Sequence, residues 1–387
     1  MHVGRRAVRL VPVLGLASLF TSTPTRAATV ETFAEMPARF EDISVGPNEN
    51  LFLPSHPAGD LVFRLDLDGT LTEIGSGFQF PLGGAVAANG DYYVSCFNAN
   101  HIHRIAADGT ISVFATGIVT PTGLVFTPDE QTLYAASYNL GQLIRIDTVS
   151  GDRTVVADGS TIVAPDGIAL DEAGNVYVAS FLTPTITKVD PAGNESVLVT
   201  LPGTKTGYID YRSGFLYVAG LDTHQIYRVS TVDGTYTTLA GTGVPGTTDG
   251  PAESALIDSP NGLALSKDGR TLWFQSQNLV RRVLLGDPAD VKEGAAQPWS
   301  GRVSLVPNPF REKTRVELSS VTGSAVVSIC DAAGRLLRTL SGSSATGDVV
   351  LEWDGADAMG RSVADGVYYV RVATADGSAD SRVVRLR

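Results

Sequence analysis

The stretch Pro165-Asp-Gly-Ile-Ala-Leu-Asp-Glu-Ala-Gly-Asn-Val-Tyr-Val-Ala-Ser180 joins a Pro-x-Gly-apolar phrase to a polar turn and a strand-like apolar run. The phrase recurs along the chain as Pro81-Leu-Gly-Gly-Ala-Val, Pro121-Thr-Gly-Leu-Val-Phe and Pro260-Asn-Gly-Leu-Ala-Leu, with degenerate copies at Thr206-Gly-Tyr-Ile-Asp-Tyr and Glu41-Asp-Ile-Ser-Val. The spacing is about 40 residues, the period typical of propeller blades. Because a single blade cannot bury its faces alone, the repeat predicts blades that close into a ring.

Each copy contains the pattern of four short strands. In the copy that begins at Pro165 these are residues 167–170, 175–180, 185–190 and 196–200, with Asp, Gly and Pro turns between them. The sixth copy ends after its third strand, near Leu285, whereas Thr29-Val-Glu-Thr-Phe-Ala-Glu has the pattern of a fourth strand. We therefore predict that this N-terminal strand completes the last blade and leaves no free sheet edge. The predicted fold of residues 28–286 is an all-β, six-bladed propeller.

The N-terminal residues have the pattern of an export signal. Arg5, Arg6 and Arg9 precede the apolar run from Leu10 to Phe20, and small residues then favour cleavage after Ala27. We expect residues 1–27 to be a signal peptide and the mature protein to be secreted or held at the cell surface, without a membrane span.

Charge and cysteine content limit the partners. The chain has a net charge of −12, and the acidic excess lies in residues 28–301, which argues against nucleic acid and anionic membranes as partners. A small molecule, a glycan or a protein at the channel face stays compatible with this charge. The two cysteines, Cys96 and Cys330, fall in different predicted domains, so we expect both to be buried free thiols.

Two propeller families resemble residues 29–286. Leu239-Ala-Gly-Thr-Gly-Val-Pro-Gly-Thr-Thr-Asp-Gly, leading into Pro260-Asn-Gly-Leu-Ala, is similar to an NHL repeat with its loop insertion. The other copies resemble NHL repeats and gluconolactonase (senescence-marker-protein) propellers equally. Both resemblances imply the same fold, but propellers of this kind host lactonases, lyases, other hydrolases and binding platforms.

The C-terminal residues 302–387 have a different pattern, with short alternating strands and Gly/Asp turns that predict a small β-sandwich. Ser304-Leu-Val-Pro-Asn-Pro-Phe, Leu351-Glu-Trp-Asp-Gly and Gly366-Val-Tyr-Tyr are similar to FlgD-type immunoglobulin-like modules of exported bacterial proteins. The resemblance includes sorting domains of the type IX secretion route, which implies the secretion machinery as a partner. Residues 287–301, rich in Gly, Ala, Pro and charge, are the expected linker.

Gluconolactonase-like enzymes hold a divalent cation at the start of the first strand of several blades. Glu41, Asp166 and Asn261 occupy those motif positions in this chain, and oxygen ligands of this kind suit calcium. The resemblance therefore implies a metal site made by these three residues. Leu82, Thr122 and Thr206 occupy the other positions, so the match is partial, and Asp or Asn before glycine is also an ordinary turn residue.

Four histidines of the mature chain lie in or beside the second loops of their repeats: His56, His101, His103 and His224. A zinc lyase of the amidating type would need three of them on one metal. Because they belong to three different repeats, we interpret them as scattered surface histidines.

Two functions stay open. The main hypothesis is an exported ligand- or protein-binding platform delivered or anchored by its C-terminal module. The alternative is a calcium-dependent, gluconolactonase-like hydrolase that acts at the channel mouth.

Overall fold

The computed structural model describes residues 28–55, 60–159, 161–285, 302–321, 323–331, 336–344, 347–357, 360–374 and 377–386. The predicted signal peptide (1–27) and linker (287–301) lie outside these ranges. The described residues form strands throughout, apart from one 3-10 turn, η1 (Phe97–Ala99). No helix within them has the length and apolar character that crossing a membrane requires.

Five predicted repeats form five antiparallel, four-stranded sheets, whose strands are paired in chain order. Blade 1 contains β2 (Ser44–Val45), β3 (Leu51–Ser55), β4 (Leu61–Leu65) and β5 (Leu71–Ser76). Blade 2 contains β6 (Pro81–Val86), β7 (Tyr92–Cys96), β8 (His101–Ile105) and β9 (Ile111–Thr116). Blade 3 contains β10 (Pro121–Phe126), β11 (Thr132–Ser137), β12 (Gln142–Asp147) and β13 (Arg153–Ala157). Blade 4 contains β14 (Pro165–Leu170), β15 (Val176–Ser180), β16 (Thr185–Val189) and β17 (Glu195–Thr200). Blade 5 contains β18 (Thr206–Arg212), β19 (Phe215–Gly220), β20 (Gln225–Ser230) and β21 (Tyr236–Ala240).

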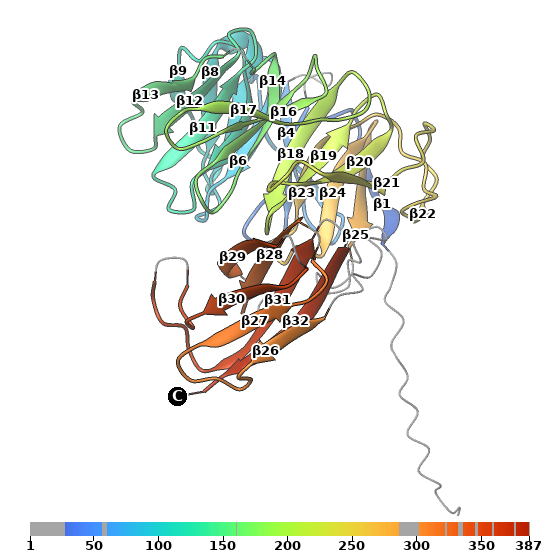
Figure 1. Ribbon diagram of the computed structural model, residues 1–387. Coiled ribbons are helices and arrows are strands. Elements are labelled where there is room, and N and C mark those ends of the chain that lie inside the picture. Colours follow the sequence, from blue (N-terminus) through green and yellow to red (C-terminus); the bar gives the residue numbers. More distant parts are fainter. Residues whose placement is uncertain are drawn as a thin grey trace, which may run out of the picture.

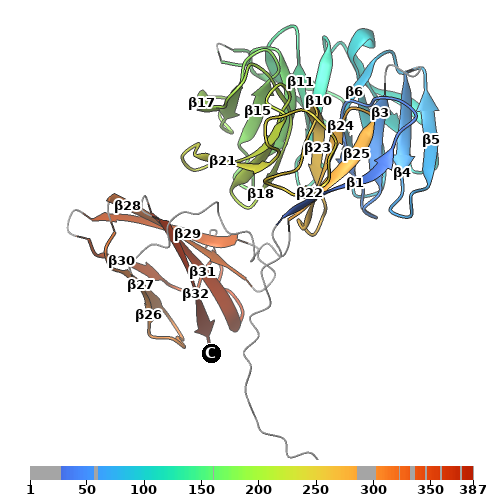
Figure 2. The same cartoon turned by 90° about the vertical axis from the view of Figure 1, so that its right-hand side faces the viewer.

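The last blade joins the two ends of this region (Figures 1 and 2). Blade 6 contains β23 (Pro260–Leu265), β24 (Thr271–Ser276) and β25 (Leu279–Leu284), followed by the N-terminal strand β1 (Thr29–Glu35). Val30 pairs with Val283 in this antiparallel ladder, which confirms the predicted closure. The two-residue strand β22 (Gly250–Pro251) covers the outer edge of β1, so the inserted loop before β23 protects that edge.

Buried Arg281 fastens this closure. Its guanidinium is fully buried and donates to Leu256 O over 2.7 Å and to Thr248 O over 3.2 Å. It also forms an ion pair with Asp249 over 2.7 Å, and Asp249 accepts from the main-chain N–H of Thr32 in β1. One side chain of β25 therefore holds the inserted loop, which in turn holds β1.

The glycine of the repeated phrase has a steric cause. A Cβ atom added at Gly167 would lie 2.4 Å from Tyr208 Cα of the next blade, and one at Gly262 would lie 2.5 Å from Asp42 Cα of blade 1. Gly83, Gly123 and Gly207 are crowded by the following blade in the same manner. Each first strand thus touches the next around the axis, and only glycine permits that approach.

The C-terminal domain is a sandwich of two sheets. The first sheet contains β26 (Val303–Val306), β27 (Thr314–Leu318) and β30 (Val349–Trp353). The second contains β29 (Leu336–Ser344), β28 (Gly323–Cys330), β31 (Gly366–Thr374) and β32 (Gly377–Arg385). Trp353 is the centre of its core, with the Phe310 ring 5.3 Å and the Tyr368 ring 5.2 Å away. The predicted β-sandwich is confirmed.

Both cysteines are free, as expected, but their burial differs. Cys96 is buried at the end of β7, whereas Cys330 is only half-buried. The expectation of a buried thiol was therefore wrong for Cys330. The cause is strand alternation, because Ala325, Val327 and Ile329 of β28 are buried whereas the intervening positions, Cys330 among them, are only half-buried.

Candidate functional site

The loops around the ring's axis share one construction, which defines what we call the mouth face. In blades 2, 3 and 4 the residue after the second strand donates its main-chain N–H to the loop that precedes the first strand. The bonds run from Phe97 to Phe80 O, from Tyr138 to Thr120 O and from Phe181 to Ala164 O, with lengths of 2.9–3.0 Å. In these three blades the loop before the first strand and the loop after the second strand therefore lie on the same face.

Two of the three predicted site residues, Asp166 and Asn261, occupy backbone irregularities on this face. Strand pairing shifts register between Pro165 and Ile168 in blade 4, and between Pro260 and Leu263 in blade 6. Asp166 and Asn261 lie inside these shifts. Bulges of this type redirect a side chain that a regular strand would place on a sheet face. Here they turn the side chain before the glycine toward the ring's axis.

The structure brings two of the predicted residues into contact and places the third beside them. Asn261 Nδ2 donates to Glu41 Oε2 over 3.0 Å. Burial, followed by the negative charge of Glu41, raises the pKa of Asp166 to about 8. Asp166 is 6% exposed and Asn261 is 4% exposed, whereas the Glu41 side chain retains 14% exposure. The three residues form one acidic group at the axis, which solvent reaches through Glu41.

A fourth residue, Asp42, adds a third carboxyl group to this cluster and was not predicted. It occupies the glycine position of blade 1, and its carboxylate accepts from Gly84 N over 3.1 Å and from Ile43 N over 2.7 Å. Burial raises the pKa of Asp42 well above its usual value, and the charge of Asp166 acts in the same direction. Asp42 is the one residue other than glycine at the third position of the repeated phrase, and this exception was the signal in the sequence that could have identified it.

The donor set fits an oxygen-ligated cation. Asn261 Oδ1 is buried and has no hydrogen-bond partner, which is costly unless a ligand satisfies it. Two carboxyl groups, Glu41 and Asp166, repel each other beside it, and a divalent cation would relieve that repulsion. Amide and carboxylate oxygens are the ligands that calcium prefers.

The remaining axial positions are structural. The Thr122 hydroxyl donates to Pro165 O and the Thr206 hydroxyl donates to Ser180 O, each over 2.8 Å. Both threonines therefore join neighbouring blades. The acidic group is confined to one part of the axis.

An aromatic arc lines the mouth face next to this group. The rings of Phe97 and Tyr138 are 5.7 Å apart, and those of Tyr138 and Phe181 are 6.2 Å apart. Lys205 Nζ lies 5.3 Å from the Phe181 ring. Burial and then the charge of Asp166 raise the pKa of Tyr138, so the middle of the arc is close to the acid. All four side chains are half-buried and offer apolar and cationic contact surface.

The histidines are not all scattered, and for two of them that prediction was wrong. His101 and His103 lie together on β8, with Cys96 of β7 beside them. The prediction failed because it considered only histidines from different repeats, whereas the structure joins two histidines of one repeat with the cysteine across the hairpin. His224 is separate and accepts from Ser259 N over 3.1 Å. His56 lies outside the described residues.

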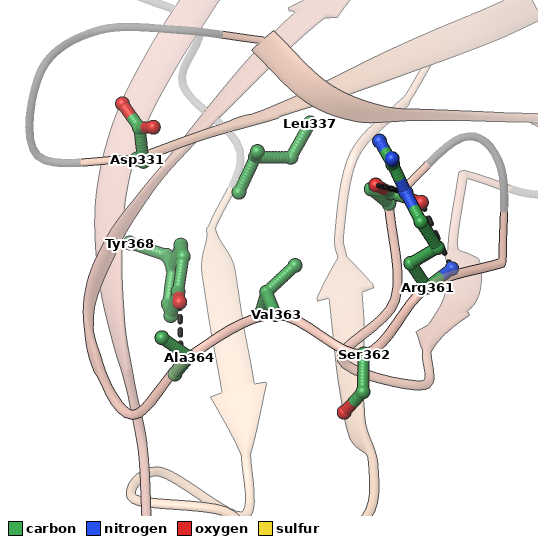
Figure 3. Close-up of a pocket in the computed structure, with 8 residues that line it drawn as sticks. Asp331, Leu337, Arg361, Ser362, Val363, Ala364 and Tyr368 are labelled. Atoms are coloured by element: carbon green, nitrogen blue, oxygen red, sulfur yellow. Dashed lines mark hydrogen bonds and ion pairs between the residues drawn. The ribbon is translucent and has the colours of Figure 1, made fainter.

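A hollow of about 410 Å³ lies in the C-terminal sandwich (Figure 3). Its polar wall is mostly self-paired, since Arg361 Nε donates to Asp357 over 2.9 Å and the Tyr368 hydroxyl donates to Ala364 O. Leu337 and Val363 supply the apolar part. This pairing leaves little free polar chemistry there, and we place the candidate site in the propeller.

Family models match both parts of the chain. Residues 81–210 match the SMP-30/Gluconolactonase/LRE-like region, and residues 310–378 match the FlgD Ig-like domain. A pentonolactonase of Haloferax volcanii is 26% identical over 227 residues, which cover 58% of this chain and 62% of the pentonolactonase. The chain thus spans less than two thirds of that relative.

Solved structures show the same propeller fold at low sequence identity. A gluconolactonase of Xanthomonas campestris is 15% identical with a TM-score of 0.54, over 66% of this chain and 89% of the gluconolactonase. A virginiamycin B lyase of Staphylococcus aureus is 17% identical with a TM-score of 0.51, over 67% of this chain and 99% of the lyase. The chain therefore has a β-propeller fold whose residues 81–210 are similar to the gluconolactonase-like family, and its residues 310–378 are similar to the FlgD Ig-like domain.

Proposed function

We propose that the propeller hydrolyses a lactone at the mouth face, with calcium held by Glu41, Asp166 and Asn261. The observation that carries this proposal is the buried polar group at the axis. Asn261 donates a hydrogen bond to Glu41, the charge of Glu41 raises the pKa of Asp166, and Asn261 Oδ1 has no hydrogen-bond partner. The similarity to a pentonolactonase supports a sugar lactone as the substrate class. This proposal places the hydrolase hypothesis ahead of the binding platform.

The reaction needs water to add to the lactone carbonyl carbon, the ring C–O bond to break, and a proton to reach the ring oxygen. When bound, calcium would supply electrostatic stabilisation for the negative charge that develops on the carbonyl oxygen. As a ligand of the cation, Asp166 would stay ionised, so the proton that reaches the ring oxygen would come from the attacking water.

The aromatic arc suits the substrate's ring. The Tyr138 and Phe181 rings offer apolar faces beside Asp166, and Lys205 offers a donor at the arc's end. Aromatic contacts of this kind orient a ring without demanding one pattern of hydroxyl groups. They would hold the ester group against the acidic group.

The test is hydrolysis of pentono- and gluconolactones by the full chain, with calcium and with a chelator. We expect calcium-dependent turnover that Asp166→Asn and Glu41→Gln each reduce by on the order of a hundredfold or more. Glu253→Gln is the matched control, because Glu253 is an exposed acid of the inserted loop. If the wild-type protein hydrolyses none of these lactones in the presence of calcium, the proposal is overturned.

A binding platform is the second candidate, favoured by exposed apolar side chains on the mouth face. Val119, Leu140, Val163 and Leu182 are 36–55% exposed in the loops of blades 3 and 4. A sugar lactone needs no such surface outside the arc. Ligand binding that Leu140→Ser and Leu182→Ser weaken, without turnover of any lactone, would favour this function.

We further propose that the chain is exported and that residues 302–387 deliver or anchor it. The supporting observation is the separate core of this sandwich, in which Trp353 packs against Phe310 and Tyr368. A domain with its own core is a transferable unit.

A further inference from the structure

A second polar cluster lies in blade 2, on the strands next to the mouth face. Cys96 is the last residue of β7 and pairs directly across the ladder with His101, the first residue of β8. His103 follows two positions later, so its side chain leaves the same face of the sheet. The hairpin therefore presents one sulfur and two imidazole groups side by side.

The distances within the cluster match a metal site. His103 Nδ1 lies 3.1 Å from Cys96 Sγ and 3.2 Å from His101 Nε2, and all three ligand atoms lie within 4.8 Å of one another. A tetrahedral ion with metal–nitrogen bonds of about 2.0 Å and metal–sulfur bonds of about 2.3 Å would separate its ligands by roughly 3.3–3.6 Å. Small side-chain adjustments would therefore centre an ion between the three atoms.

Among the described residues, this is the one group in which at least three His, Cys, Asp or Glu ligand atoms approach so closely. The acidic group at the axis is separate from it and offers oxygen ligands. The chemistry also differs, since sulfur and imidazole select zinc or copper, whereas carboxylates select calcium.

The surroundings hold the ligands and keep one side open. Cys96 is buried in the apolar layer that includes Phe52, Val62 and Phe78, and the Phe78 ring lies 5.3 Å from the His103 ring in an edge contact. His101 and His103 are half-buried. The metal would thus have a dry sulfur side and a side that water reaches, which is typical of a site with an open fourth position.

A role as a catalytic thiol explains the cluster less well. Cys96 is buried in an apolar layer, and the nearby charge of Asp60 is negative. A reactive cysteine needs a partly exposed, electropositive environment. The Asp60 carboxylate would also help to balance the positive charge of a bound ion.

We propose that Cys96, His101 and His103 bind one transition-metal ion of the zinc and copper class. Zn²⁺, Cu²⁺ and Co²⁺ are titrated into the metal-stripped full chain, and the stoichiometry, affinity and melting temperature are measured. We expect one ion per chain, a higher melting temperature with zinc, and with cobalt the near-ultraviolet absorption of a sulfur-to-metal charge transfer.

The variants identify the ligands. Cys96→Ser should abolish the cobalt–sulfur absorption. His101→Gln or His103→Gln should weaken zinc binding by at least roughly tenfold, because replacing even a residue that only supports a ligand lowers metal affinity by that factor. His224→Gln and Cys330→Ser are the matched controls. Glu41→Gln should leave zinc binding intact, which separates this site from the calcium site.

If none of the three metals binds at one ion per chain, the proposal is overturned. Equal zinc affinity in wild type, Cys96→Ser and His103→Gln would overturn it as well. Melting of each metal-free variant shows whether it is folded. If a histidine variant fails to fold, the cobalt spectrum of the wild-type chain still reports sulfur ligation, and its absence contradicts the proposal.

Discussion

Asn261 donates its side-chain amide to the Glu41 carboxylate across 220 positions of sequence, and this bond joins the last blade to the first at the axis. The contact exists because β1 closes the ring and because Gly262 lets the start of β23 touch Asp42. Ring closure and assembly of the acidic group are therefore one structural event. A substitution that disturbs the ring closure should therefore also disturb the acidic group, and the reverse.

Calcium is expected to raise the melting temperature of the full chain, as a ligand of the native state must. At a free concentration one hundred times its Kd, the gain is about 2.7 kcal/mol. Combined Glu41→Gln and Asp166→Asn should remove the shift, measured by differential scanning calorimetry, while the metal-free variant remains folded. An unchanged shift in the double variant would place calcium elsewhere.

The stability of the calcium-free protein should fall as pH rises from about 4 to about 8. An unfolded Asp ionises near pH 3.9, whereas folded Asp166 keeps its proton until about pH 8. Between these values the unfolded state binds fewer protons, so proton release favours unfolding, and the loss levels off above pH 8. Urea unfolding across this range should show a flatter profile for Asp166→Asn. A profile identical to wild type would assign the pH dependence to other groups.

Arg281→Ala should destabilise the protein by on the order of 3 kcal/mol, because the side chain is fully buried and donates to three acceptors. Arg64→Ala is the control, since the Arg64–Asp66 pair retains 39% and 33% side-chain exposure and such a pair contributes about 0–1 kcal/mol. Deleting Thr29–Glu35 should be more severe still, because it leaves β25 as an open edge. Chemical denaturation measures all three, and a deletion that melts like wild type would contradict the closure.

Gly167→Ala should cost more than Gly109→Ala. The added Cβ at Gly167 meets backbone atoms of blade 5 at 2.4 Å, whereas the one at Gly109 meets nothing within 4 Å and suffers only from its φ of +87°. We expect about 1 kcal/mol for Gly109→Ala and a clearly larger loss for Gly167→Ala. Because Asp166 precedes Gly167, the latter variant should also weaken calcium binding. Equal losses would mean that the blades are not in contact here.

Residues 302–387, fused to an unrelated exported reporter, should direct it to the surface or medium of a host with the type IX route. A Trp353→Ala fusion is the control, because it removes the centre of the sandwich core. Fractionation and immunoblotting distinguish the outcomes. A reporter retained in the periplasm by the intact module would contradict the delivery role.

The repeated phrase was sufficient to predict the blades and their closure, because the glycine and the strand pattern follow from contacts that recur in every blade. It also gave six positions at the axis, and the resemblance to gluconolactonase-like enzymes selected Glu41, Asp166 and Asn261 among them. It did not reveal Asp42 as a member of the acidic group, because a side chain in a glycine position has no counterpart in other copies. The Cys96–His101–His103 cluster depends on the exact cross-strand register of one hairpin. Composition and spacing predict that register only to within one or two residues.

The pairing of Val30 with Val283 also determines when the ring can close during synthesis of the chain. β1 is made first, yet its partner is not complete until Leu284 has been added. At roughly 5–20 residues per second, the ring stays open for on the order of ten to fifty seconds. During that interval five blades can form while β1 and β25 remain unpaired, and each offers an edge to which another chain can pair.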